Sequence, residues 1–153
     1  MTTDECIKET INHIQKVSLC IDRIIKELEI RRYNHDLSKL INPEIDIFTE
    51  FTPKLKNSTY GSDEYKGFLK SMSIALEHHY KNNRHHPEHF ENGIKDMNLI
   101  DLIEMFCDWK AATLRHDDGD IYKSIEINKK RFNYSDDLEQ IFINTVKLFR
   151  DVK

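Results

Sequence analysis

The sequence of 153 residues predicts a single all-α domain, a compact bundle of about six or seven helices. Two observations support this prediction. Apolar residues recur three, four and seven positions apart along most of the chain, which is the spacing of a buried helical stripe. Polar caps and turn residues separate these stretches, and no segment shows an alternating β-pattern strong enough to compete with a helix.

The first helix is predicted to begin near Thr3, because Thr2 and Glu5 match a capping box. Its buried stripe is expected to consist of the apolar residues Ile7, Ile11, Ile14, Ile21, Ile25 and Leu28. These residues follow the three- and four-residue steps of one helix face. The helix is expected to end near residues 29–30.

A short junction over residues 31–34 then leads to His35 and Asp36 at the start of the next helix, with Asn34 as its N-cap. Further helices are expected over residues 43–55, 62–80, 99–114, 120–131 and 136–150. The connecting segments are a loop at 56–61, an irregular polar stretch at 81–97 and a turn at 116–119. One short helical turn is expected at Pro87.

Composition excludes several classes of protein. A hydrophobic fraction of 39% and a charged fraction of 33% are typical of a globular chain, and a net charge of -4 argues against an extended nucleic-acid surface. No apolar run approaches the roughly 20 residues that span a bilayer, and the polar amino-terminal residues show no secretory signal. The three cysteines lack disulfide or zinc-knuckle spacing, so the expected location is the reducing cytoplasm.

The adjacent pair His35 and Asp36 is the strongest candidate for chemistry, because one metal can take its nitrogen and oxygen donors together. His13 is expected to point inward beside the apolar stripe of the first helix. His79 follows apolar residues at steps of three and four, so it is also expected to face the core. Asp108 has apolar neighbours, and a carboxylate in such a setting needs a cation or a strong donor.

Each candidate also has a simpler interpretation when taken alone. A single inward histidine is more often a hydrogen-bonded core residue than a metal ligand. The pair His85 and His86 lies in a polar segment that water can solvate, while Glu9, Asp101 and Glu104 fit exposed acidic positions. The joint occurrence on four segments favours a metal site. Imidazole and carboxylate ligands suit Mn, Fe, Ni, Co or Zn, and the lack of nearby thiolates disfavours a cysteine-type zinc site.

This pattern resembles the HD superfamily of metal-dependent phosphohydrolases over about residues 7–115. His13 matches the histidine of the first helix in that superfamily, and His35 with Asp36 matches its defining pair. Asp108 matches the terminal aspartate. The resemblance implies an HD-type helical bundle that holds divalent metal ions.

The likeness is closer to the branch with additional histidines, as in the HD-GYP cyclic-dinucleotide phosphodiesterases. There the defining pair continues as His-Asp-x-x-Lys, which Lys39 matches. A further histidine is matched by His79 and a His-His pair by residues 85–86. In some members a glutamate one turn before the first histidine completes a third metal position, and Glu9 occupies that place. No Gly-Tyr-Pro follows His86, so the resemblance supports the metal site more than a cyclic-dinucleotide substrate.

The resemblance implies hydrolysis of a phosphate ester or phosphodiester by a two-metal centre, in which Asp36 and a hydroxide bridge the ions. The expected ligands are His13, His35 and Asp108 for one ion and His79, His85 and His86 for the other. Lys39, one turn after Asp36, is expected to bind a phosphate oxygen, and Arg84 and Arg115 to add further phosphate contacts. A small nucleotide or short cyclic nucleotide is the expected substrate.

Other classes of function stay open at this stage. The HD scaffold also carries di-iron oxygenases, and a non-catalytic nucleotide-binding or interaction protein can keep a structural metal. A homodimer is the default expectation, with the last two helices either closing the bundle or packing against a second subunit. Residues 83–88 also resemble a segment of a small family of phages and bacteria, and a phage protein would work in the host cytoplasm.

The phosphohydrolase prediction carries a structural requirement. His13, His35, Asp36 and Asp108 must converge to within metal-ligand distance of one another. The prediction fails if Asp108 faces solvent or if His13 packs away from the His35-Asp36 pair.

Overall fold

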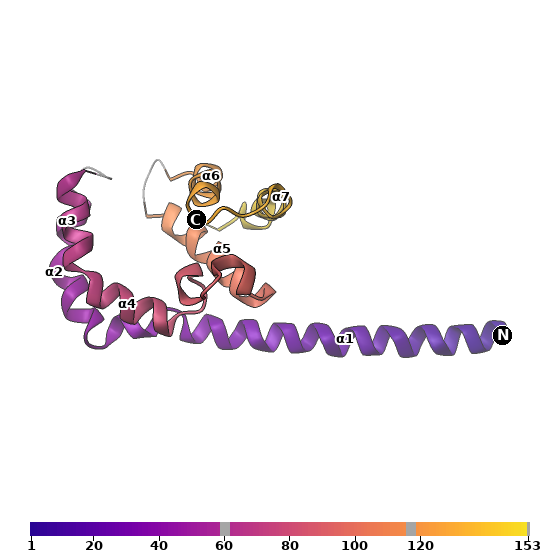
Figure 1. Cartoon of the computed structure of the whole chain (residues 1–153). Helices are drawn as coiled ribbons and strands as arrows, with labels where there is room; N and C mark the ends of the chain where they lie inside the picture. The colour runs from indigo at the N-terminus through magenta and orange to yellow at the C-terminus, as the bar shows by residue number, and fades with distance from the viewer. Residues whose placement is uncertain (59–61, 116–118, 153) are drawn as a thin grey trace. The chain divides into compact units, whose positions relative to one another are not determined.

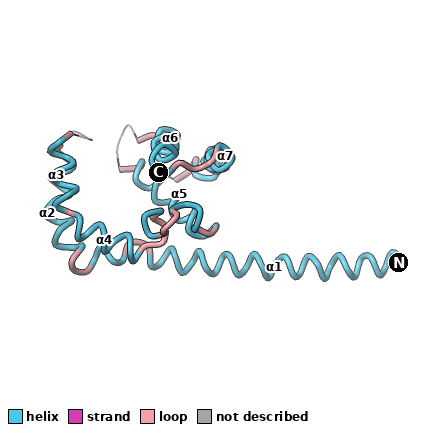
Figure 2. The backbone as a smooth tube through the Cα atoms, viewed as in Figure 1, coloured by secondary structure: helices cyan, strands magenta, loops and turns pink. Residues whose placement is uncertain are grey.

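All regular structure in the described part of the chain is helical (Figure 2), which confirms the all-α prediction. The computed structural model describes residues 1–58, 62–115 and 119–152. The α-helices in these residues are α1 Thr3–Asn34, α2 Glu44–Asn57, α3 Asp63–Ser71, α4 Ser73–Asn82, α5 Leu99–Thr113, α6 Ile121–Phe132 and α7 Asp136–Thr145. Short 3-10 helices cover η1 Leu37–Leu40, η2 Pro87–His89, η3 Gly93–Asp96 and η4 Val146–Phe149.

Helix α1 makes up nearly all of the first of two compact units, Met1–His35 (Figure 1). It begins at Thr3, and the predicted capping box of Thr2 and Glu5 is confirmed. The expected end near residues 29–30 is wrong, because α1 continues to Asn34. No glycine or proline interrupts this stretch, and two arginines in the last turn suit the negative end of the helix dipole.

The second unit, Asp36–Lys153, contains all the remaining helices. The sequence predicted one domain over residues 1–153, and the hydrophobic core cluster of the described residues lies in this second unit. The helix expected to start at His35 is not formed. Asn34 is instead the last residue of α1, and Asp36 is the N-cap of the short helix η1.

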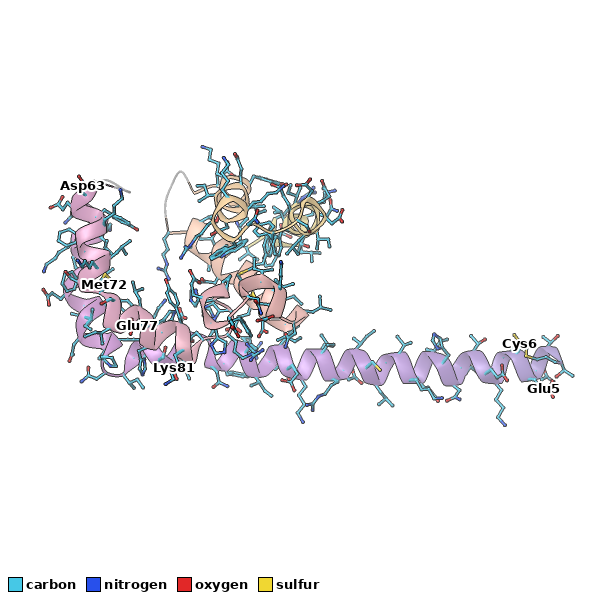
Figure 3. The ribbon with its side chains drawn as sticks, in the orientation of Figure 1. Glu5, Cys6, Asp63, Met72, Glu77 and Lys81 are labelled. Atoms are coloured by element: carbon cyan, nitrogen blue, oxygen red, sulfur yellow. The ribbon has the colours of Figure 1, made fainter. Side chains whose placement is uncertain are left out.

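Helices α2 to α4 carry one side of the candidate site. Pro43 directly precedes α2, as predicted, and α2 packs against η1 and α4. The single helix expected over 62–80 is two helices, α3 and α4, which meet at the buried Met72 (Figure 3). The Ser71 hydroxyl donates to the Gly67 carbonyl, a side-chain hydrogen bond that often bends helices. Residues 59–61 and 116–118 of the predicted loop and turn lie outside the described residues.

Helices α5 to α7 enclose the main hydrophobic core. Asn98 and Asp101 form a capping box that starts α5 at the predicted residue. The core consists of Met105, Phe106, Trp109, Ile121, Ile125, Tyr134 and Phe142. The rings of Phe106 and Phe142 stack with centroids 5.3 Å apart, and Phe132, Val146 and Phe149 pack against the same core. The last helices thus help to close this unit. No helix in the described residues is long and apolar enough to cross a membrane.

Replacing Phe142 with alanine should destabilise the protein by about 3–5 kcal/mol, because it opens a cavity beneath Phe106 and Trp109. Trp109 is the single tryptophan, so its fluorescence during urea unfolding reports on this core directly. Ile127→Ala on the exposed face of α6 is the control, with an expected change within about 0.5 kcal/mol. Equal effects of the two substitutions would contradict the core assignment.

Candidate metal centre

The backbone of Asp36 is held in the left-handed region, with φ 59° and ψ 13°. This conformation costs an ordinary residue roughly 1–2 kcal/mol, and such strain is concentrated at functional sites. The turn into η1 places Lys39 Nζ 2.6 Å from Asp36 Oδ2. The other oxygen, Oδ1, lies 3.4 Å from His79 Nε2 and 3.5 Å from His85 Nε2. Asp36 therefore turns one carboxylate oxygen towards a cation and the other towards two imidazoles.

His79 is fixed by the carboxylate of Glu44, the first residue of α2. Glu44 is fully buried, and its Oε2 atom lies 2.8 Å from His79 Nδ1. Because a carboxylate accepts hydrogen bonds, this contact assigns the proton of neutral His79 to Nδ1 and leaves the lone pair on Nε2. Carboxylate–histidine pairs of this kind orient metal ligands in many proteins. The other oxygen of Glu44 lies 2.6 Å from His78 Nδ1 on the same helix.

His85 and His86 follow the end of α4, where the chain turns back over this helix. Asn83 stabilises the turn, since its amide donates to the His79 carbonyl and to the Ser38 hydroxyl of η1. His86 Nε2 then lies 2.9 Å from His79 Nε2. His85 is 1% exposed, and its Nδ1 lies 3.2 Å from the Oε1 atom of Glu104 on α5. Glu104 thus lies behind His85 as Glu44 lies behind His79.

Burial keeps two of these imidazoles neutral at pH 7. It is the largest cause of the lowered pKa of His79, and the nearby Lys39 lowers that pKa further against the opposing effects of Asp36 and Glu44. Burial, together with the neighbouring His85 and His79, lowers the pKa of His86 to about 3. Asp108 and Asp36 act in the opposite direction on His86. Neutral imidazole is the form that binds a metal ion, so these rings are ready as ligands.

Four side chains of the second unit therefore converge: Asp36, His79, His85 and His86. Each offers a ligand atom that lies within 4.8 Å of the others. Three imidazole nitrogens and one carboxylate oxygen suit Zn, Fe, Mn, Ni or Co, and no thiolate belongs to this set. The donor set thus fits one divalent transition metal ion.

A pocket of about 400 Å³ adjoins this cluster. It is lined by the polar residues Asp36, Lys39, Thr52, His79, Tyr80, His86 and Arg115 and by the apolar residues Phe48, Met72 and Leu76. The volume lies at the small end of the range for small-molecule sites. Two cationic side chains line the pocket, Lys39, which is paired with Asp36, and Arg115.

The structure brings together only part of the predicted site. The predicted second ligand group, His79, His85 and His86, meets Asp36 in the cluster, and Lys39 contacts Asp36 as expected. His13 does not join the His35-Asp36 pair. It is exposed on α1, 22 positions before His35, the C-cap of α1, and this separation corresponds to about 33 Å of helix.

Within the first unit, the continuous helix α1 separates His13 from His35, so these two predicted ligands of one ion do not meet. Glu9, the expected third-metal ligand, is exposed on α1 one turn before His13 and so lies about 6 Å farther from His35 along the helix. His35 ends the first unit. Asp108 is half-buried on α5 and acts on the pKa of His86, so it does not face open solvent.

Of the two arginines predicted to contact phosphate, only one lines the pocket. Arg115 lines the pocket. Arg84 instead makes two contacts with Asp101, from Nε to Oδ1 at 3.1 Å and from Nη2 to Oδ2 at 3.0 Å. Arg84 therefore binds a helix-capping carboxylate, and its guanidinium is already engaged.

Sequence reasoning missed the buried carboxylates. Asp101 and Glu104 were expected on an exposed acidic face, yet both are buried, because α5 turns this face towards the segment after α4. Glu44 was not recognised at all. An acidic residue in the first turn of a helix is common for local electrostatic reasons, so nothing in the sequence marked Glu44 as a partner of a histidine 35 residues away.

The fold and cluster define an all-α protein with a candidate transition-metal site. Over residues 2–148 the chain matches the family described as "Family of unknown function (DUF5662)", and it belongs to that family. No curated protein and no solved structure matches the chain. The family description assigns no activity, so the resemblance to HD phosphohydrolases stays a prediction.

The metal-free protein should lose stability as the pH falls from 6.5 towards 3. Unfolded His86 takes up a proton near its ordinary pKa of 6.5, whereas the buried ring resists protonation down to about 3. The stabilisation is therefore fully present above pH 6.5 and is lost as the pH falls, and the lowered pKa of His79 acts in the same direction.

Urea unfolding of the metal-free wild type and of His86→Gln at a series of pH values measures this effect. The difference in unfolding free energy between the two proteins should shift by a few kcal/mol, in order of magnitude, across this range. Comparison with the variant cancels the titration of carboxylates and histidines that do not interact with His86. Parallel profiles for the two proteins would show that His86 is not held neutral by burial.

Proposed function

We propose that this protein binds a divalent transition metal ion through Asp36, His79, His85 and His86 and hydrolyses a small phosphate ester in the adjoining pocket. The convergence of these four ligands at a pocket with two cationic side chains carries the proposal. A divalent ion bound there supplies Lewis-acid chemistry towards a phosphoryl oxygen.

Two buried carboxylates hold histidine ligands in position before any metal ion binds. Glu44 and Glu104 lie behind His79 and His85, so these two rings are oriented by groups already in place. The carboxylates of Asp36, Glu44 and Glu104 each lie beside a histidine of this cluster, and Lys39 pairs with Asp36. A bound divalent ion offsets this negative charge, which favours cation binding over a dry hydrogen-bonded core.

Lys39 and Arg115 are the cationic side chains that would attract the negative charge of a phosphate substrate. Lys39 is paired with Asp36 Oδ2 at the wall of the pocket, where its ammonium group can also attract a phosphate oxygen as a point charge. Arg115 is exposed at the pocket, and its guanidinium has the planar fork that binds phosphate through two hydrogen bonds. The pocket volume favours a small substrate such as a mononucleotide over a polymer.

This proposal differs from the HD-type centre predicted from the sequence. It does not use His13 or Glu9, and it requires one metal ion where two were expected. The resemblance to HD enzymes is consequently not its support. The support is the local geometry of the second unit, in which one predicted ligand group and Asp36 lie together while Glu44 and Glu104 add the orienting carboxylates.

Metal content should distinguish His79 from its neighbour His78. Purified protein incubated with Mn, Fe, Ni, Co or Zn and then desalted should retain about one ion per chain. His79→Gln and Asp36→Asn should weaken metal binding more than about a hundredfold, beyond the loss expected for an orienting residue.

His78→Gln is the matched control, because His78 contacts the same Glu44 carboxylate from the same helix but does not belong to the cluster. It should retain the ion, and circular dichroism should show unchanged helicity in all variants. Metal content that is unchanged in His79→Gln, or lost equally in His78→Gln, would refute the assignment.

Arg115→Gln should raise the KM for a phosphate ester about tenfold while leaving metal content unchanged, because it removes one charged hydrogen-bond donor from the pocket. Metal-loaded protein assayed with nitrophenyl phosphates and with nucleotides measures this effect. Arg84→Gln should instead lower stability, since it leaves Asp101 buried without its guanidinium. A KM unaffected by Arg115→Gln would remove Arg115 from the substrate site.

The same assays test the two other classes of function. Bound iron together with oxygen consumption and no phosphate release would favour an oxygenase over a hydrolase. Tight nucleotide binding without turnover in the metal-loaded protein would favour a non-catalytic binding protein. Either result would overturn the proposed hydrolysis but leave the metal site in place.

A further inference from the structure

Helix α1 has an apolar face that nothing in its own unit covers. The first unit is a single helix and none of its described residues is buried. Large apolar side chains that are each more than 40% exposed are Ile7, Ile11, Ile14, Val17, Ile21, Ile24 and Ile25. Figure 3 shows side chains projecting along the length of α1. An isolated helix gains little stability from its backbone alone, so this face requires a packing partner.

The apolar residues of this face are spaced as in a coiled coil. Apolar residues alternate in steps of four and three from Ile7 to Leu28, broken only by Ser18. In heptad notation the d positions are Ile7, Ile14, Ile21 and Leu28, and the a positions are Ile11, Ser18 and Ile25. A sustained repeat of 3.5 residues keeps one seam of a helix against another helix of the same kind. The partner indicated by this pattern is therefore a helix.

The flanking residues disfavour a parallel pair of α1 helices. In a parallel pair each g position faces the e position five residues later on the partner. Val17 would then face the partner's Asp22, and Ile24 would face the partner's Glu29. The next a position is Arg32, which would face the partner's Arg32. This arrangement places apolar side chains against carboxylates and two like charges together.

An antiparallel pair moves Val17 and Ile24 away from the carboxylates and places the two Arg32 side chains at opposite ends of the pair. When Ser18 faces the partner's Ile21, the e positions face each other and Lys8 lies beside the partner's Glu29. The g positions then place Val17 beside the partner's Ile24. A twofold axis repeats each contact, so one helix is complementary to itself in charge and in apolar surface. This complementarity between the two ends of α1 favours a second copy of the chain over any unrelated surface.

We propose that α1 pairs with α1 of a second copy as an antiparallel coiled coil, in the register that places Ser18 opposite the partner's Ile21. The two-copy assembly buries the apolar face of both helices. It does not depend on the proposed metal centre or on its chemistry, because the residues involved all lie in the first unit.

Sedimentation equilibrium of the full chain under reducing conditions tests the pairing. The wild type should be a dimer, and Ile21→Glu should weaken it by at least about a hundredfold, because two charges enter the seam beside the twofold axis. Leu19→Glu is the matched control. Leu19 is more exposed than Ile21 and lies outside the seam, so this variant should stay dimeric.

Charge reversal tests the register. Lys8→Glu or Glu29→Lys alone should weaken the dimer about tenfold, since each creates two repulsive pairs, and the double variant should recover wild-type affinity. A shifted antiparallel register would place Lys8 beside the partner's Asp22, and Glu29→Lys would not then rescue Lys8→Glu.

Three results would overturn the proposal. A chain that is monomeric at all concentrations would place another surface, such as the second unit of the same chain, against α1. A dimer unaffected by Ile21→Glu would assign the interface to other helices. A dimer weakened by Lys8→Glu that the double variant fails to restore would exclude the proposed register.

Discussion

The contact between the Glu44 carboxylate and His79 Nδ1 is the interaction on which the candidate centre depends. Glu44 is fully buried, so its charge must be balanced by groups inside the protein. By accepting a hydrogen bond from His79 Nδ1, it directs the Nε2 lone pair of that ring towards His86 and Asp36. The first residue of α2 thereby sets the orientation of a ring on α4, and two helices distant in sequence become parts of one site.

The two sides of the second unit contribute differently to this arrangement. Helices α2 and α4, with η1 between α1 and α2, supply Asp36, His79 and the residues that orient them. Helix α5 supplies Glu104 behind His85, and its opposite face is held in the aromatic core with α6 and α7. Because α5 is anchored by large buried rings, the position of Glu104 is coupled to the packing of that core.

Much of the fold was predictable because helix signals are local. The capping box of Thr2 and Glu5 and the polar Asn98 before Leu99 placed the starts of α1 and α5 correctly, since a cap depends only on residues within one turn. The division of one expected helix into α3 and α4 at Met72 was not predictable, because the helical spacing of apolar residues continues across Met72. The site was predictable only in part. His79 and residues 85–86 were identified because histidines are rare and their spacing was informative, whereas Glu44 resembled an ordinary residue of a first helical turn.

The sequence by itself determined the helical class, most helix starts and the chemical nature of the candidate ligands, because these follow from caps, spacing and side-chain type. Only the tertiary structure decided which ligands meet. It continued α1 without a break to Asn34 and so kept His13 far from His35 along one helix, while it buried Glu44 and Glu104 against histidines of other segments. The physical reason is that convergence depends on the directions of whole helices. A few added residues of continuous helix displace a side chain by many ångströms, and no local pattern encodes that displacement.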